Sequence, residues 1–572
     1  PDLKPFFAAT YLPKSTSRGM LGVIDLSEKI QNLWRGEDRE RIVGQADRIV
    51  EILKTHVHAV GETLPKESTV LQTAEILFKI ADPVWGGMKG APKFPLGYQA
   101  NFLLRYFLRS QDSRALFLVE KTLDMMHRGG IYDHIGGGFA RYSVDEQWQI
   151  PHFEKMLYDN AILSYGYLEA WKVTKRELYA QVSQDILDYI AREMQFEQGG
   201  FYSAEDADSE NVEGLFYTWT MQEILDALGI DQGGLFCDFF GVIDLGPLEG
   251  RNVLHMPYSY EEFANIRGMD VHLLRAAIKK MIAQLFIVRA GRKKPFKDDK
   301  IITSWNGLAI FAFIEAGFTF QRPDYIHIAV KAAEFIKNNM WKDGVLYRRY
   351  RDEEARFAAS LDDYAFLTRG LISLFERTGD SQWLRWALEL VNALKFDFKE
   401  QHGAFYQASE FDENLLIRKT QFADGAEPSG NAIHAENLLR LYQITANRDF
   451  LEQAEDILKA SERFISAYPL GYCYNLVALE RYFDKNKALI VICKSSDAQA
   501  NDEITNSINQ KVLPHHSIIM LNSNQNNVAS IVPSFAQYVS KDSLPTMYLC
   551  KEGVCLPPVV GKDNIVDAIS KL

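Results

Sequence analysis

Apolar residues recur at helical spacing through most of this chain. Ten stretches place them three and four residues apart instead of in strict alternation, which is the pattern of an amphipathic α-helix. The stretches are residues 102–109, 116–126, 162–173, 185–194, 308–318, 327–340, 364–377, 383–394, 432–444 and 450–464. The pattern predicts a mainly α-helical protein.

Short segments rich in glycine and aromatic residues separate the predicted helices. They begin at Gly129 (GGIYDHIGGGF), Gly199 (GGFYSAEDADSE), Asp343 (DGVLYRRY) and His402 (HGAFYQASE). Helix pairs joined by such turns at long, uneven intervals suggest a closed ring of helical hairpins or an α-solenoid. We favour the ring, because solenoid repeats have shorter, regular periods and turns that are poor in Tyr, Trp, Asp and Glu. A ring that gathers its polar aromatic turns at one end would surround a single cavity suited to a saccharide.

The two ends of the chain differ from the helical body. Residues 1–65 begin with a strand-and-turn pattern and continue into a helical pattern at 25–54, whereas residues 66–484 form the predicted body. Residues 485–572 contain the short β-rich runs ALIVIC and SIIML between helical segments. Strands that alternate with helices predict a small α/β region packed on the body.

Composition and charge narrow the class of protein. With 572 residues, 47% of them hydrophobic, the chain can bury a large core, and no apolar run reaches the roughly 20 residues that span a membrane. The net charge is −13, and Lys and Arg are interspersed with acids, which argues against nucleic-acid binding. The first residues lack the pattern of a signal peptide. We expect a cytoplasmic protein whose partner is a small molecule, with no nucleic acid or membrane involved.

The cysteines and acidic runs give no sign of a metal or a cofactor. The five cysteines are sparse and odd in number, which suits a reducing compartment, and none has zinc-ligand spacing. Cys550 and Cys555 are near enough in sequence to pair, although we favour two buried thiols beside a strand. The acidic run from Asp206 departs from the EF-hand pattern, because Asn211 stands where glycine is required.

Titratable side chains are densest in residues 131–161, IYDHIGGGFARYSVDEQWQIPHFEKMLYDNA. Pro151 suits the first turn of a helix, so we expect a helix to begin there. On that helix His152, Lys155 and Asp159 would share one face. A general acid or base and a counter-charge would then project together. The alternative is that His152 and Asp159 only satisfy each other and nearby loop amides.

Six blocks, in order over almost the whole chain, resemble the signature blocks of one family. They are GGMKGAPKFP from Gly86, YDHIGGGFARYSVDEQWQIPHFEKMLYDNA from Tyr132, GGFYSAEDADSENVEGLFYTW from Gly199, KKPFKDDKIITSWNGLAI from Lys293, DDYAFLTRGL from Asp362 and DGAEPSGNA from Asp424. The family they resemble is the thioredoxin-domain-containing, six-hairpin-glycosidase-like family, which includes bacterial YyaL-type proteins and spermatogenesis-associated protein 20.

The resemblance also implies a fold and a domain organisation. It implies that residues 66–484 form an (α/α)6 barrel similar to that of the N-acylglucosamine and cellobiose 2-epimerases and, more distantly, of six-hairpin glycosidases. The opening PDLKPFFAATYLP resembles the end of the family's thioredoxin-like domain, so residues 1–65 are expected to be a remnant of that domain. The family's Trp-Cys-His motif does not occur in this sequence, and we expect the chain to be a fragment or a processed form.

Two chemistries suit such a barrel. Epimerisation needs a base of near-neutral pKa, and His152 is the best candidate, with Glu154 or Asp159 to orient it. Candidate second histidines are His134, His255 and, least favoured, His434. Hydrolysis instead needs two carboxyls, about 5–5.5 Å apart for retention or 6.5–9.5 Å for inversion. The candidate acids are Asp133, Asp145, Glu205, Asp206, Asp208, Asp363, Asp424 and Glu427.

Several other side chains are candidates for contact with substrate. Trp305 and Asn306 stand at an apparent helix start, where the amide either caps the helix or contacts a hydroxyl. Tyr364 is one of the aromatic residues that could stack on a sugar. Arg141 either clamps a carboxylate or phosphate or pairs with Asp145.

The sequence thus predicts a sugar isomerase or epimerase with a histidine base. A glycoside hydrolase with a carboxylate pair is the first alternative, and a non-enzymatic ligand-binding or redox-regulatory protein linked to its thioredoxin domain is the second. The predicted catalytic residues are His152, Glu154, Asp159 and Asp363. The predicted substrate-binding residues are Asp133, His134, Arg141, Glu205, Asp206, Trp305, Asn306, Tyr364, Asp424 and Glu427.

Overall fold

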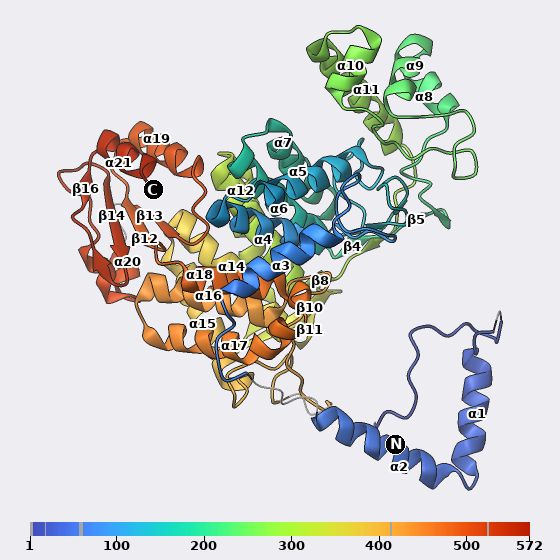
Figure 1. The fold of residues 1–572 in the computed structure, drawn as a ribbon, viewed down its shortest axis with the longest axis horizontal. Coiled ribbons are helices and arrows are strands. Elements are labelled where there is room, and N and C mark those ends of the chain that lie inside the picture. Colours follow the sequence, from blue (N-terminus) through green and yellow to red (C-terminus); the bar gives the residue numbers. More distant parts are fainter. Residues whose placement is uncertain (1–3, 18, 56–60, 96, 412–414, 523–525) are drawn as a thin grey trace.

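Six helices form a closed inner ring in a computed structural model of the protein, which describes residues 4–17, 19–55, 61–95, 97–411, 415–522 and 526–572. In order around the ring they are α4 (Gly97–Ser110), α6 (Leu157–Thr174), α12 (Thr303–Thr319), α14 (Leu361–Thr378), α16 (Gly430–Thr445) and α18 (Cys473–Phe483). Each contacts the next, and α18 returns to contact α4 (Figure 1). The predicted (α/α)6 barrel is therefore confirmed.

An outer helix packs against each inner helix. The outer helices are α3 (Ser68–Ile80), α5 (Ser113–Arg128), α7 (Glu177–Tyr189, continued by a π-turn at Ile190–Met194), α13 (Pro323–Asn339), α15 (Ser381–Asp397) and α17 (Arg448–Ala467). The outer α17 buries a single stripe that includes Ala454, Ile457 and Leu458, as an amphipathic helix does. The inner α12 is apolar on all sides and almost wholly buried, because it is surrounded by other helices.

The neighbouring inner helices α12 and α14 cross closely, because small residues lie at the contact. A Cβ atom added to Gly307 would lie 2.5 Å from the backbone nitrogen of Leu367. On the facing helix, a Cβ added to Gly370 would lie 3.1 Å from the carbonyl oxygen of Gly307. Larger residues would force the two helices apart.

Short strands occupy the loops that lead into the inner helices. They are β1 (Tyr142–Ser143), β2 (Pro151–His152), β3 (Lys155–Met156), β4 (Ala204–Glu205), β5 (Asp208–Ser209), β6 (Val212–Glu213), β7 (Lys297–Asp298), β8 (Ile301–Ile302), β9 (Trp341–Lys342), β10 (Val345–Arg351) and β11 (Glu354–Ala358). β3, β4 and β7 form one sheet, and β10 joins β8, β9 and β11 in another. The glycine-aromatic segments thus build a polar layer at the N-terminal ends of the inner helices.

A second helical unit interrupts the barrel between β6 and β7. It consists of α8 (Met221–Leu228), α9 (Ile230–Phe239), α10 (Tyr260–Arg267) and α11 (Val271–Ala290). Its apolar side chains form a core of their own, which includes Phe236, Phe239 and Ile278. Figure 1 shows this unit standing beside the barrel at the upper right.

The C-terminal region is the predicted α/β unit. Its sheet contains β12 (Leu489–Cys493), β13 (Ser517–Leu521), β14 (Thr546–Lys551), β15 (Val554–Cys555) and β16 (Val559–Val560). β12 runs parallel to β13 and antiparallel to β14. The helices α19 (Ala498–Asn509) and α21 (Lys562–Ser570) share a core with one face of the sheet, while β13 contacts α14 of the barrel. The short α20 (Asn526–Ala529) lies between β13 and β14.

The expectation of two free thiols in this unit is wrong. Cys550 and Cys555 form a disulfide, and their Cα atoms are 3.9 Å apart. The hairpin register of β14 and β15 places the two residues directly opposite each other. Spacing along the chain could not reveal this pairing.

The N-terminal helices α1 (Val23–Arg35) and α2 (Arg39–Thr55) lie away from the barrel (Figure 1). α1 contains no buried residue. Residues 4–13, the described part of the expected strand segment, form no strand, so that expectation is wrong for them. A strand requires a partner for its backbone groups, and none of the described strands pairs with this segment.

Candidate functional site

Asparagines at the start of inner helices hold the glycine-aromatic loops in place. The Asn306 side chain accepts a hydrogen bond from the backbone N–H of Phe201 (2.7 Å) and donates to its carbonyl oxygen (3.0 Å). Asn160 in α6 and Asn431 in α16 hold the phenylalanines of their own loops in the same way. These bonds give Asn306 a structural role, which favours the helix-start alternative over a hydroxyl contact.

Five of the predicted or neighbouring side chains meet where α6 and α12 begin, and we call them the mouth cluster: Arg141, Tyr158, Asp159, Trp305 and Glu427. The Tyr158 and Trp305 rings lie edge to face, with centroids 4.9 Å apart. The Trp305 indole N–H donates to a Glu427 carboxylate oxygen at 3.0 Å. Arg141 is hydrogen-bonded to Tyr158. The mouth cluster therefore combines two carboxyls, one cation and two aromatic rings.

The mouth cluster raises the pKa of both of its carboxyls. Burial raises the pKa of Asp159 well above its usual value; Arg141 opposes this, while the Glu427 charge adds to it. One Asp159 oxygen, Oδ2, is buried without a hydrogen-bond partner among the described residues. Burial also raises the pKa of Glu427 to about 7, although the hydrogen bond from Trp305 opposes the rise. The neighbouring Asp362, at the start of α14, has its pKa raised to about 6 by burial and by Asp363.

His152 lies next to the mouth cluster and is connected to it through Glu154. Its ring stacks on Tyr142, with centroids 5.1 Å apart, and its Nδ1 lies 2.8 Å from a Glu213 oxygen. Its Nε2 lies 3.7 Å from Glu154, whose carboxylate accepts a 3.0 Å hydrogen bond from Arg141. A continuous path of contacts therefore connects His152 to the mouth cluster.

The predicted helix start at Pro151 is wrong. Residues 151–152 form β2, which pairs with β1, and residues 155–156 form β3, which pairs with β4. The helix α6 begins only at Leu157, so His152 and Asp159 do not share a helix face. Cross-strand pairing of the loops competes with the helix at these positions, and the local sequence does not reveal the pairing partners.

Asp133, a predicted substrate-binding residue, lies instead in a buried ionic group. Lys155 Nζ and Arg289 Nη1 each donate to it at 2.8 Å, and the backbone N–H groups of Ile135 and Gly136 donate to it at 3.0 Å. Burial alone would raise the pKa of Asp133, but Arg289 and Lys155 bring it below its usual range. Because Arg289 belongs to α11, this group fastens the second helical unit to the barrel.

Other predicted residues are held by the backbone or by buried partners. Asp363 accepts hydrogen bonds from the N–H groups of Ser360 and Ser304, and Asp424 accepts from the N–H groups of Ser429 and Tyr474. Both side chains thus cap the starts of inner helices, where the helix dipole favours negative charge. Burial nevertheless raises the pKa of Asp424 to about 7, although these backbone hydrogen bonds oppose the rise.

Three further predicted residues also lie in packed surroundings. His134 is buried against the Gly129 carbonyl, and burial lowers its pKa to about 4. Glu205 accepts a hydrogen bond from Tyr189, and the Tyr364 hydroxyl accepts one from the Leu346 N–H. Asp206 is exposed in the turn after β4. None of these four side chains belongs to the mouth cluster.

Sequence reasoning overlooked Asp362 and Glu213. Asp362 stands beside Asp363 in the DDYAF block; Asp363 caps the helix, and both acids contribute to the raised pKa of Glu427, Asp362 more strongly. Glu213 lies 61 residues from His152 and carries no local signal.

An apolar cavity of about 460 Å³ lies beside the mouth cluster. Its walls come from α4 and α5 and include Gly425 and Ala426, which directly precede Glu427. Within the described ranges no group of three or more His, Cys, Asp or Glu side chains could hold a metal ion. None of the helices in that part of the chain has the length and apolar character needed to cross a membrane.

Comparisons with known proteins identify the family. The family model described as "Thioredox_DsbH: Protein of unknown function, DUF255" matches residues 1–54. Human spermatogenesis-associated protein 20 is 31% identical over 605 residues, covering 98% of this chain and 77% of its own.

Two solved structures are similar at low identity. Cellobiose 2-epimerase from Bacillus thermoamylovorans B4167 is 9% identical, covers 70% of this chain and 87% of its own, and has a TM-score of 0.45. Unsaturated glucuronyl hydrolase from Bacillus sp. GL1 is 13% identical, covers 73% and 95%, and has a TM-score of 0.43. The barrel itself is established by the helix contacts of this chain, and by its similarity to the human protein the chain belongs to the spermatogenesis-associated protein 20 family.

Proposed function

We propose that the mouth cluster is the active site of an enzyme that cleaves a glycosidic bond by acid–base catalysis, with Asp159 and Glu427 as the two carboxyls. The observation that carries the proposal is the pair itself. Asp159 in the first turn of α6 and Glu427 in the loop before α16 interact electrostatically, and the pKa values of both carboxyls are raised. Carboxyl pairs whose environments set their pKa values apart are typical of acid–base catalysts.

The surroundings of the two carboxyls suggest different roles. Asp159 has an unpartnered buried oxygen and a pKa well above its usual value, so it holds its proton and suits the general acid. Glu427, with a pKa of about 7 and a hydrogen bond from Trp305, ionises more readily and suits the base or nucleophile. Asp159 would protonate the glycosidic oxygen. Glu427 would accept a proton from the attacking water, or would itself attack the anomeric carbon.

The aromatic side chains favour a sugar as the substrate. Trp305 and Tyr142 are partly exposed, and Tyr158 supports Trp305 from its edge. Flat apolar rings beside a few charged groups suit a ring with both C–H faces and hydroxyl groups.

The proposal is tested with the purified chain on a panel of nitrophenyl glycosides and oligosaccharides. On a cleaved substrate, Asp159→Asn and Glu427→Gln should each lower kcat/KM by about 10²–10⁴-fold. Glu146→Gln changes an exposed acid in the β1–β2 loop; it is the matched control and should retain activity. Activity should rise with pH through about 7 as Glu427 ionises, and Glu427→Gln should remove that limb. Full activity in both site variants would exclude the assignment.

An isomerase or epimerase is the second candidate, and the placement of His152 favours it. The ring is partly exposed, stacked on Tyr142 and fixed by Glu213, as a general base requires. Two of the three candidate second histidines, His134 and His434, are buried, which favours a reaction with one histidine base. Incubation with the sugar in heavy water should place deuterium on the carbon beside the carbonyl, and His152→Ala should abolish the exchange. If neither cleavage nor exchange occurs on any sugar, the ligand-binding role gains support.

A further inference from the structure

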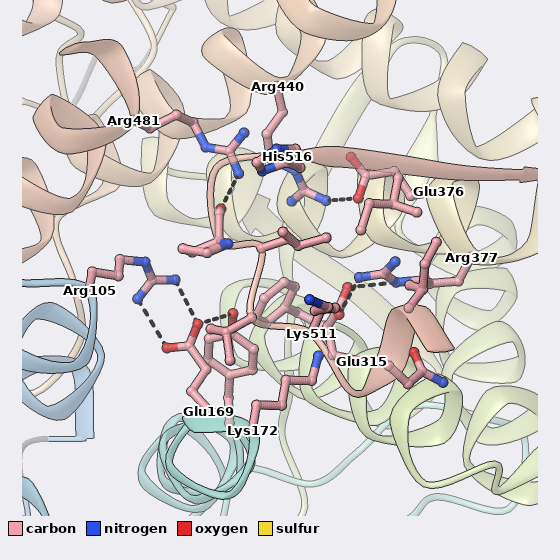
Figure 2. A pocket seen from close by; sticks show the side chains of 18 of the residues that line it. Arg105, Glu169, Lys172, Glu315, Glu376, Arg377, Arg440, Arg481, Lys511 and His516 are labelled. Atoms are coloured by element: carbon pink, nitrogen blue, oxygen red, sulfur yellow. Dashed lines mark hydrogen bonds and ion pairs between the residues drawn. The ribbon is translucent and has the colours of Figure 1, made fainter. Parts of the chain in front are cut away.

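The barrel contains a polar chamber at the end opposite the mouth cluster. A cavity of about 80 Å³ lies among the C-terminal halves of the inner helices, and we call it the basal cavity. Its lining includes Arg105, Lys172, Arg369, Arg377 and Arg481. Residues 508–518 of the C-terminal unit close it from outside (Figure 2).

Positive charge exceeds negative charge around the basal cavity. Seven Lys and Arg side chains and four glutamates line it, an excess of three positive charges in a protein of net charge −13. Three of the glutamates are paired by hydrogen bonds to Arg105, Arg377 and Arg440 at 2.8–3.0 Å. Figure 2 shows these pairs around the chamber. Among the described residues, Arg369 and Arg481 are left with only the fourth glutamate, Glu436, which they share electrostatically.

Arg369 is the clearest of these cations. It is 4% exposed, its Nε is buried without a partner, and none of the described residues accepts a hydrogen bond from its guanidinium. The nearest carboxylate oxygen, on Glu436, is 3.8 Å from Nε. The guanidinium lies over the Phe311 ring at 3.8 Å, which holds it in position. Helix C-termini attract cations only within the last turn, and Arg369 lies nine residues before the end of α14 at Thr378.

Lys172 and Arg481 also belong to the excess positive charge around the basal cavity. Burial, together with the nearby Arg377 charge, lowers the pKa of Lys172 to about 8, although Glu315 opposes the change. Burial likewise lowers the pKa of Arg481 to about 10. Among the described residues, Arg481 donates to neutral oxygens, including the Pro514 carbonyl at 2.7 Å. Figure 2 shows Lys172 reaching from α6 toward Glu315. An uncompensated buried charge is costly, so a bound anion would stabilise this group.

From this geometry we infer that the basal cavity binds a small tetrahedral oxyanion of the size and charge of inorganic phosphate. The planar fork of Arg369 matches the oxygens of such an anion. The volume of the cavity accommodates a few water-sized groups, which suits a free oxyanion and excludes a nucleotide. Because residues 508–518 line the cavity, the bound anion would also join the C-terminal unit to the barrel.

The inference is tested by titrating the phosphate-free chain with inorganic phosphate in a calorimeter, with sodium chloride at equal ionic strength as the reference. We expect saturable binding with a Kd below about 1 mM. Arg369→Gln should weaken it by at least about tenfold. Lys172→Met, on a partly exposed residue, provides a second variant if Arg369→Gln does not fold. Arg114→Gln, an exposed arginine on α5, removes the same charge elsewhere and should bind as the wild type does.

A crystal soaked in tungstate locates the anion independently. An anomalous peak beside Arg369 is the expected result. Absence of saturable binding, a peak elsewhere only, or unchanged affinity in both Arg369→Gln and Lys172→Met would overturn the inference.

Discussion

Asp133 is shared by two buried cations, Lys155 and Arg289, and Asp133→Asn tests its role as an anchor. Lys155 and Arg289 each lie 2.8 Å from it, and the three side chains are 3%, 5% and 8% exposed for Lys155, Arg289 and Asp133, respectively. Asparagine keeps an oxygen for the N–H groups of Ile135 and Gly136. It removes the charge, however, and turns an amide N–H₂ toward one of the cations.

The expected loss in the free energy of unfolding follows from the two cations, Lys155 and Arg289, that lose their carboxylate in Asp133→Asn. Removing one partner of a buried ion pair destabilises a protein by about 3–5 kcal/mol. Lys155→Met leaves Asp133 paired with Arg289, so it should cost less, about 1–3 kcal/mol. The double variant, Asp133→Asn with Lys155→Met, lacks one of the two cations that Asp133→Asn leaves unpaired. Its loss of stability should therefore be smaller than the sum of the losses in the two single variants. The pKa of Asp133 is lowered in the fold, so its stabilisation is present above the unfolded-state value of 3.8 and is lost as the pH falls below that value.

Urea unfolding followed by circular dichroism measures the loss, and hydrogen exchange shows where it occurs. Because Arg289 stands in the last turn of α11, amides of α11 should exchange faster in Asp133→Asn than those of α16 on the far side of the ring. A change below about 1 kcal/mol, with exchange in α11 unaltered, would refute the anchoring role.

Two further predictions concern packing and pH. Gly307→Ala should destabilise the barrel by about 1–3 kcal/mol, because its Cβ would meet the backbone of α14, whereas Gly234→Ala, where no atom lies within 4 Å, should be neutral or slightly stabilising in the same thermal unfolding assay. Equal effects of the two substitutions would contradict the close crossing. Burial raises the pKa of Glu480 from 4.5 to about 7, so its contribution to stability is present below 4.5 and is lost as the pH rises through 7. Glu480→Gln should therefore gain stability over the wild type by up to about 3 kcal/mol between pH 5 and pH 8, and a pH-independent difference would count against this.

The helical barrel could be predicted from sequence because its signal is repeated and local. Apolar residues at intervals of three and four mark both outer helices such as α17 and inner helices such as α12. The glycine-aromatic loops also carry a local signal, since three of them are held through a phenylalanine by an asparagine in the first turn of an inner helix, as Phe201 is held by Asn306. The density of titratable groups in residues 131–161 led to His152, Glu154 and Asp159.

The composition of the site was decided by contacts between distant segments. Asp133 and Arg289 are 156 residues apart, and Trp305 and Glu427 are 122 apart. No local sequence pattern can therefore show that Asp133 belongs to a buried ionic group and Glu427 to the mouth cluster. Because the residues from Pro151 onward pair as strands, the helix begins at Leu157 and not at Pro151 as predicted. The register of a hairpin brings Cys550 and Cys555 together. Whether a charged residue is paired, capped or left without a partner depends on which groups the ring brings together, and only the tertiary structure determines this.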